Sequence, residues 1–116
     1  MKRQVAERSG RDAEDRAARW LQEQGWAVVA RRVKSKAGEI DLVMRREGLV
    51  AFVEVKWRLR AAELGLAIDE RRLARVAAAA EAVAHDYLEP GDDMRIDVIL
   101  LAPGTPPRHI ANAWQP

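Results

Sequence analysis

The sequence contains no cysteine among its 116 residues, which excludes a disulfide framework, a thiolate metal site and a cysteine nucleophile. Its apolar runs are much shorter than the roughly 20 residues that span a bilayer, and the opening MKRQVAERSGR lacks the apolar stretch of a secretory signal. No glycine-rich phosphate loop is present, which disfavours nucleoside triphosphate hydrolysis. We therefore expect one soluble, cytoplasmic domain over residues 1–116 with no membrane partner.

Lysine is scarce, because 16 of the 20 basic residues are arginine. The formal net charge is only +2, but residues 1–60 carry a net charge of +6 and residues 61–116 carry −4. Arginine binds phosphate through two parallel hydrogen bonds, so a basic half favours a nucleic acid or another phosphate-bearing partner. The alternative is that these arginines only keep the surface soluble, which is their commonest role.

The hydrophobic pattern predicts a helix, three strands, a second helix and two further strands, an α/β order of α-β-β-β-α-β-β. This order implies a mixed sheet flanked by helices. The first helix is expected to start near Arg11 with Ser9 as its cap and to end at Gly25, and the second to start at Asp69 and stop before Pro90. The expected strands cover residues 26–33, 39–45, 49–58, 94–102 and 108–114, the fourth of them central and the last at an edge.

Two residues, Glu47 and Gly48, are suited to a tight hairpin turn between the second and third strands. With such a turn Arg46 pairs with Leu49, and the same register places Asp41 opposite Glu54. It also places Glu39 opposite Lys56. On the second strand, alternation puts Ile40, Leu42 and Met44 on one face.

Two carboxylates in directly opposed positions are about 4.5–5.5 Å apart at Cβ and repel each other unless something binds them. A divalent cation, Mg²⁺ or Mn²⁺, is the natural solution because it prefers oxygen ligands. Asp41 and Glu54 are therefore candidate metal ligands, with the Val55 carbonyl as a further oxygen donor. Lys56 is positioned to stabilise charge on a phosphate or to help activate a water. Glu14, at the rim of the first helix's buried stripe, can lean into a cleft between helix and sheet.

Several other polar and aromatic residues are open to more than one interpretation. His85 and His109 lack metal-ligand spacing and are expected to be structural or at the surface. Trp57 is expected to pack in the core or an interface rather than to stack on a base. Arg95 and Asp97 share a strand face and can pair with each other, and their role stays open.

The motifs GEIDLV at 38–43 and FVEVKWR at 52–58 resemble the signature blocks of the bacterial YraN family. The segments at 13–26, 95–101 and 109–114 are also similar to that family, so the resemblance covers nearly the whole chain. The family is similar in fold to archaeal Holliday junction resolvases and belongs to the restriction endonuclease-like PD-(D/E)xK superfamily.

The resemblance implies roles for individual residues. Asp41 and Glu54 correspond to the metal-binding carboxylates, Lys56 to the catalytic lysine, and Glu14 to a first-helix glutamate that can reach the metal or its waters. Arg58, Arg71 and Arg72 are the candidate phosphate contacts. Two departures from the family pattern occur: arginine replaces the lysine often found early in the long helix, and Ile40 replaces the superfamily's proline.

These observations lead to a first hypothesis, a Mg²⁺- or Mn²⁺-dependent endonuclease that hydrolyses DNA, rather than RNA, and favours branched or flapped substrates. A homodimer would suit paired cuts. The first alternative is a nucleic-acid-binding module that keeps the nuclease fold without catalysis. The second is a scaffold protein that keeps the hairpin for stability.

Overall fold

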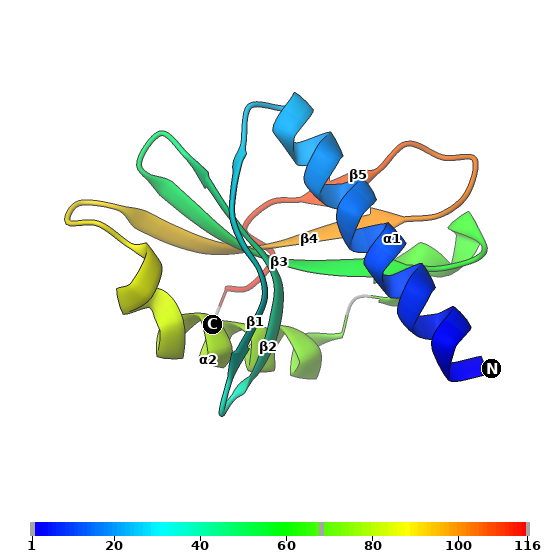
Figure 1. The fold of residues 1–116 in the computed structure, drawn as a ribbon, viewed down its shortest axis with the longest axis horizontal. Helices are drawn as coiled ribbons and strands as arrows, with labels where there is room; N and C mark the ends of the chain where they lie inside the picture. Colours follow the sequence, from blue (N-terminus) through cyan, green and yellow to red (C-terminus); the bar gives the residue numbers. More distant parts are fainter. Residues whose placement is uncertain (1, 68, 116) are drawn as a thin grey trace.

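A computed structural model describes residues 2–67 and 69–115, with side chains described for residues 10–65 and 69–115. It forms a five-stranded mixed sheet in the order β1-β2-β3-β4-β5, with β3 and β4 parallel and the other neighbours antiparallel (Figure 1). The elements are α1 (Lys2–Glu23), β1 (Ala27–Ser35), β2 (Gly38–Arg46), β3 (Leu49–Trp57), the 3-10 helix η1 (Ala61–Ala67), α2 (Glu70–Tyr87), β4 (Asp93–Leu101) and β5 (Arg108–Ile110). The predicted α/β class and element order are confirmed. Among the described residues, no helix is long and apolar enough to cross a bilayer.

Helix α1 begins earlier in the chain than the predicted start near Arg11. It runs from Lys2, so Ser9 lies inside the helix and the predicted cap is wrong. Residues 2–8 contain no proline or glycine to stop a helix, and most of them are good helix formers. Helix α2 follows the prediction, because the Asp69 side chain accepts a hydrogen bond from the Arg71 backbone N–H, as an N-cap does.

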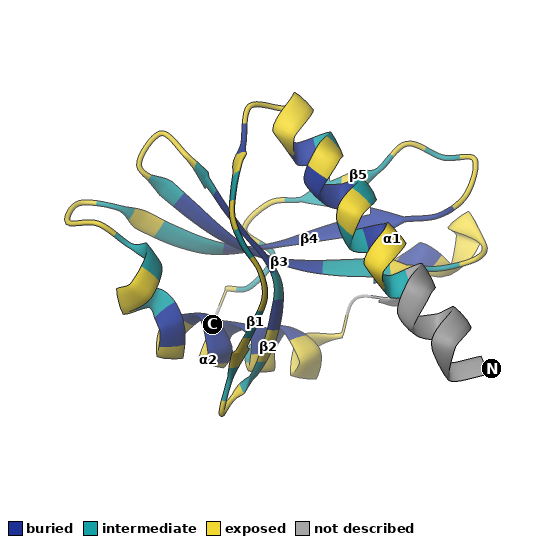
Figure 2. Cartoon of the chain, viewed as in Figure 1, coloured by how far each residue is buried: buried dark blue, intermediate teal, exposed yellow. Residues whose placement is uncertain are grey.

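The two helices cover opposite faces of the sheet. Ala13, Ala17, Ala18 and Leu21 of α1 recur at helical spacing and pack on one face. On the other face α2 contributes six of the fifteen buried residues of the second cluster, which includes the fully buried Phe52. Figure 2 shows buried residues concentrated along β3 and β4, between the two helices. Strand β3 is therefore the centre of the sheet, while β4 lies one position away from it and β5 forms an edge.

The β2–β3 hairpin has the predicted turn. Glu47 and Gly48 both have positive φ angles, 45° and 76°, as a two-residue turn of type I′ requires. Arg46 aligns with Leu49, and the ladder continues as far as Leu42 and Val53. This part of the predicted register is confirmed.

Candidate metal centre

Strands β2 and β3 separate directly after Leu42 and Val53, the last pair of their ladder. From there β2 stays paired with β1, while β3 stays paired with β4 as far as Trp57. The sheet therefore forks, and the β1–β2 ribbon bends away from β3 in Figure 1. Asp41 and Glu54 are the next residues on the two strands, so they stand at the opening of this fork.

The fork overturns two details of the predicted hairpin. Glu39 aligns with Lys34 of β1, so its predicted pairing with Lys56 is wrong. Ile40 packs in the α2 cluster, whereas Leu42 packs in the α1 cluster, so the strict alternation breaks at Asp41. The reason is that β2 follows β1 out of the plane of β3, which turns Ile40 to the other face.

The Asp41 carboxylate helps to hold the fork together. Its Oδ2 accepts a hydrogen bond of 2.8 Å from the Val55 backbone N–H. A side chain thus takes the role that a backbone carbonyl of β2 would have in a continuous ladder. This contact fixes Asp41 beside the β3 segment that carries Glu54.

Glu54 is 2% exposed and only one of its oxygens has partners. Its Oε1 lies 3.2 Å from Lys56 Nζ and 3.2 Å from Arg72 Nε of α2. Its Oε2 is buried and has no hydrogen-bond partner. Buried polar atoms without partners are rare and destabilising, and one explanation for such an atom is an ion-binding role.

The environment of Asp41 opposes its ionisation. Burial, and then the charges of Glu54 and Glu14, raise the pKa of Asp41 from 3.8 to about 7. The hydrogen bond from Val55 N–H and the charge of Arg72 act in the opposite direction but are weaker. A second negative charge is thus held close to Glu54 at an energetic disadvantage.

These observations fit a divalent cation. A cation between the carboxylates would give Glu54 Oε2 a partner and would remove the repulsion that raises the pKa of Asp41. Within the described ranges, no three acidic or histidine side chains are grouped closely enough to hold a metal by themselves. Two carboxylates are as many as Mg²⁺ often takes from a protein, because it keeps several waters and binds substrate phosphates as well.

The family model and the relatives that match this chain all carry the same family name. A family model described as the uncharacterised protein family UPF0102 matches residues 13–101. The chain belongs to the UPF0102 family. A UPF0102 protein of Erythrobacter litoralis is 72% identical over the full length of both chains, and one of Sphingopyxis alaskensis is 58% identical, also over both full lengths. One of Rhizorhabdus wittichii is 51% identical over 97% of this chain and 96% of its own. This membership confirms the resemblance to YraN, which is the same family.

In this UPF0102 chain Glu14 is placed beside the fork but is held by another partner. Its Oε1 accepts a hydrogen bond of 2.8 Å from Arg32 Nε of β1, and its side chain is 14% exposed. Burial raises the pKa of Glu14 more than the Arg32 contact lowers it. Glu14 therefore contributes charge near Asp41, and its contact with a metal or its waters stays a prediction.

The three candidate phosphate contacts are placed differently. Arg72 leans over the site, with its side chain 46% exposed and its Nε on Glu54. Arg58 follows the end of β3, and its guanidinium donates to the Trp57 carbonyl. Arg71 is exposed on α2, where its backbone N–H bonds the Asp69 cap. Arg72 is thus the one that the structure brings to the carboxylates.

A second buried carboxylate lies on the α1 side of the sheet. Asp97 is fully buried and accepts hydrogen bonds from Arg95, His109 and the Asn112 backbone N–H. Burial alone would raise its pKa, but the bonds from His109, Arg95 and Asn112 together hold the pKa of Asp97 below its ordinary value. The Arg95–Asp97 spacing indicated this pair, whereas nothing in the sequence placed His109 with it. Both carboxylate oxygens of Asp97 have hydrogen-bond partners, so this network serves to hold β5 against β4.

Proposed function

We propose that this protein is a Mg²⁺- or Mn²⁺-dependent nuclease that hydrolyses phosphodiester bonds of DNA at the β2–β3 fork. The observation that carries the proposal is the buried Oε2 of Glu54, which has no hydrogen-bond partner, together with the effect of the Glu54 charge in raising the pKa of Asp41. Such an arrangement is stabilised by binding a cation. The family resemblance supports the same residues and adds the substrate class.

The chemistry assigns a task to each side chain. Asp41 and Glu54, with the Val55 carbonyl, would hold the cation, which when bound polarises a phosphate and lowers the pKa of a water. In the hydrolysis, the oxygen of a water would form the new bond to phosphorus as the bond from phosphorus to the leaving oxygen breaks. The attacking water would release one proton to the solvent, and the leaving oxygen would take one up.

Lys56 and Arg72 provide the positive charge around the reacting phosphate. Both lie 3.2 Å from Glu54 Oε1, so they are already held at the site by the carboxylate. Negative charge accumulates on the phosphate oxygens in the transition state, and a fixed ammonium stabilises it. Arg72 retains enough exposure to contact a neighbouring phosphate as well.

The alternative is a nucleic-acid-binding module without catalysis, and one observation favours it. Lys56 and Arg72 already compensate the charge of Glu54. The buried carboxylate therefore has cationic partners even when no metal is bound. This alternative predicts binding that weakens steeply with salt and no turnover with any divalent ion.

A cleavage assay separates the two. Purified protein is incubated with branched, nicked and single-stranded DNA in Mn²⁺, Mg²⁺ or EDTA. We expect cleavage only with metal, its loss in Glu54→Gln, and a reduction of about 10²–10³-fold in Lys56→Ala. Glu81→Gln, an exposed carboxylate on the same helix as Arg72, is the matched control and should cleave normally. Cleavage in EDTA, or cleavage that survives Glu54→Gln, would contradict the mechanism.

A further inference from the structure

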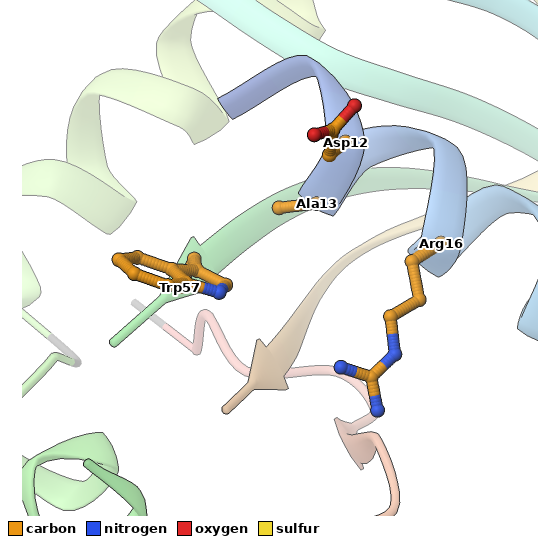
Figure 3. A pocket seen from close by; sticks show the side chains of 4 residues that line it. All are labelled: Asp12, Ala13, Arg16 and Trp57. Atoms are coloured by element: carbon orange, nitrogen blue, oxygen red, sulfur yellow. The ribbon is translucent and has the colours of Figure 1, made fainter. Parts of the chain in front are cut away.

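The end of β3 carries an exposed tryptophan over a small pocket. Trp57 is 36% exposed, so of the two positions predicted for it, the core or an interface, the core is wrong. Among the described residues, Asp12, Ala13 and Arg16 of α1 line a pocket of about 240 Å³ together with Trp57. Figure 3 shows Asp12 and Ala13 above the indole, while the Arg16 guanidinium extends into the space beside it.

The pocket combines a planar surface with two charges of opposite sign. Asp12 and Arg16 are four residues apart on a helix, so they share a face. The Arg16 guanidinium is fixed by donating a hydrogen bond of 3.0 Å to the Thr105 carbonyl, and Arg16 and Trp57 line the same pocket. The volume is below the roughly 300–1,000 Å³ of pockets that enclose drug-sized ligands, so it suits a single planar ring system.

This combination matches the chemistry of a nucleobase. A base stacks on an aromatic side chain whatever its sequence, because every base has a π face. A carboxylate such as Asp12 accepts hydrogen bonds from the exocyclic amine of a base, and a guanidinium such as Arg16 binds the adjoining phosphate.

The pocket lies on the opposite face of the sheet from the carboxylate fork. Trp57 directly follows Lys56 on β3, and successive side chains of a strand point to opposite faces. Glu54 is three residues away, which is about 10 Å along a strand. A base that occupies the pocket while its strand also reaches the fork must pass around the end of β3, and a base stacked inside a duplex cannot do this.

We propose that Trp57, Asp12 and Arg16 form a subsite for one unpaired nucleobase of the substrate. The proposal rests on the proposed function for the identity of the ligand as nucleic acid, and it narrows the substrate class to DNA with an unpaired segment beside the cleaved bond. A second pocket of about 280 Å³ continues along α1, shares Arg16 with the first and includes Arg19 and Trp20. It provides a path for the next part of the unpaired strand.

The test is a binding measurement in EDTA, so that it does not depend on cleavage. Fluorescence anisotropy compares a duplex that has a single-stranded overhang with a blunt duplex of the same paired length. Trp57→Ala should weaken overhang binding by roughly 5- to 150-fold, the equivalent of about 1–3 kcal/mol for one lost stacking contact, and leave blunt-duplex binding unchanged. Trp57→Phe, which keeps a ring, should retain most of the affinity. Leu59→Ala, an exposed apolar neighbour, is the control and should bind as the wild type does.

Three results would overturn the proposal. The first is that Trp57→Ala leaves overhang binding unchanged, and the second is that it weakens binding to both duplexes equally. The third is that sedimentation shows self-association of the wild type that Trp57→Ala abolishes, because the indole would then be a contact between two copies. If the wild type binds the overhang through Trp57 but cleaves nothing in Mn²⁺, the nuclease proposal fails and the base subsite stands.

Discussion

Replacing Asp41 by asparagine should stabilise the metal-free protein above neutral pH. The pKa of this carboxyl is raised to about 7 by burial and by the charge of Glu54, so its ionised form is the unfavourable one in the folded chain. Asparagine has nearly the same shape, and its side-chain oxygen can still accept the hydrogen bond from Val55 N–H. The substitution therefore removes the repulsion and keeps the contact that closes the fork.

The size of the effect follows from the difference between the two pKa values. A folded value of about 7 against 3.8 for an ordinary aspartate is about three pH units, or up to about 4 kcal/mol. The folded chain binds this proton more tightly than the unfolded chain does. The wild type's free energy of unfolding should therefore fall as pH rises from about 4 to about 7, and it should then level off. The free energy of unfolding of Asp41→Asn should not fall in this way, because asparagine does not titrate.

Urea denaturation in EDTA, followed by tryptophan fluorescence at about pH 5 and about pH 8, measures the difference. At the higher pH we expect Asp41→Asn to have a larger free energy of unfolding than the wild type. At the lower pH this difference should be smaller. Glu81→Gln makes the same chemical change at an exposed position and should follow the wild type at both. A wild type that is equally stable at both values, or an Asp41→Asn variant that is less stable at the higher pH, would refute the reasoning.

Three further predictions concern the frame of the site, and each is measured by chemical denaturation at neutral pH. Asp97→Asn should lower the free energy of unfolding by about 3 kcal/mol, because the partly buried Arg95 then loses the charge of its carboxylate partner. Since the pKa of Asp97 is held low, this loss should shrink in acid as the wild-type carboxyl takes up its proton. Phe52→Ala should cost about 3–5 kcal/mol through the cavity it leaves in the core. Asp69→Ala should cost about 1 kcal/mol through loss of the α2 cap, and an unchanged value would count against that role.

The features that the sequence predicted well depend on short-range signals. The Glu47-Gly48 turn fixes the hairpin register as far as Leu42 and Val53. Asp41 and Glu54 follow this last pair, but they are not paired in the ladder as predicted. The α2 start is equally local, because the Asp69 cap bonds a backbone N–H only two residues away.

The features that were missed depend on residues far apart in the chain. The turn of Ile40 to the other face follows from β2 staying with β1 after β3 diverges, which no pattern within β2 reveals. His109 reaches Asp97 only because β5 folds back along β4. Trp57 is predicted to pack in the core or an interface because it lies on the opposite strand face from Lys56, and only the position of α1 shows that it lines a surface pocket.

Titration of the apoprotein with Mn²⁺ by calorimetry tests the central claim most directly, because it asks whether the Asp41–Glu54 pair holds a divalent ion. We expect Mn²⁺ to bind to the wild type and to Glu81→Gln, and this binding to be lost in both Asp41→Asn and Glu54→Gln. Mn²⁺ binding that persists unchanged in those two variants, or a folded wild type that binds no Mn²⁺, would contradict it.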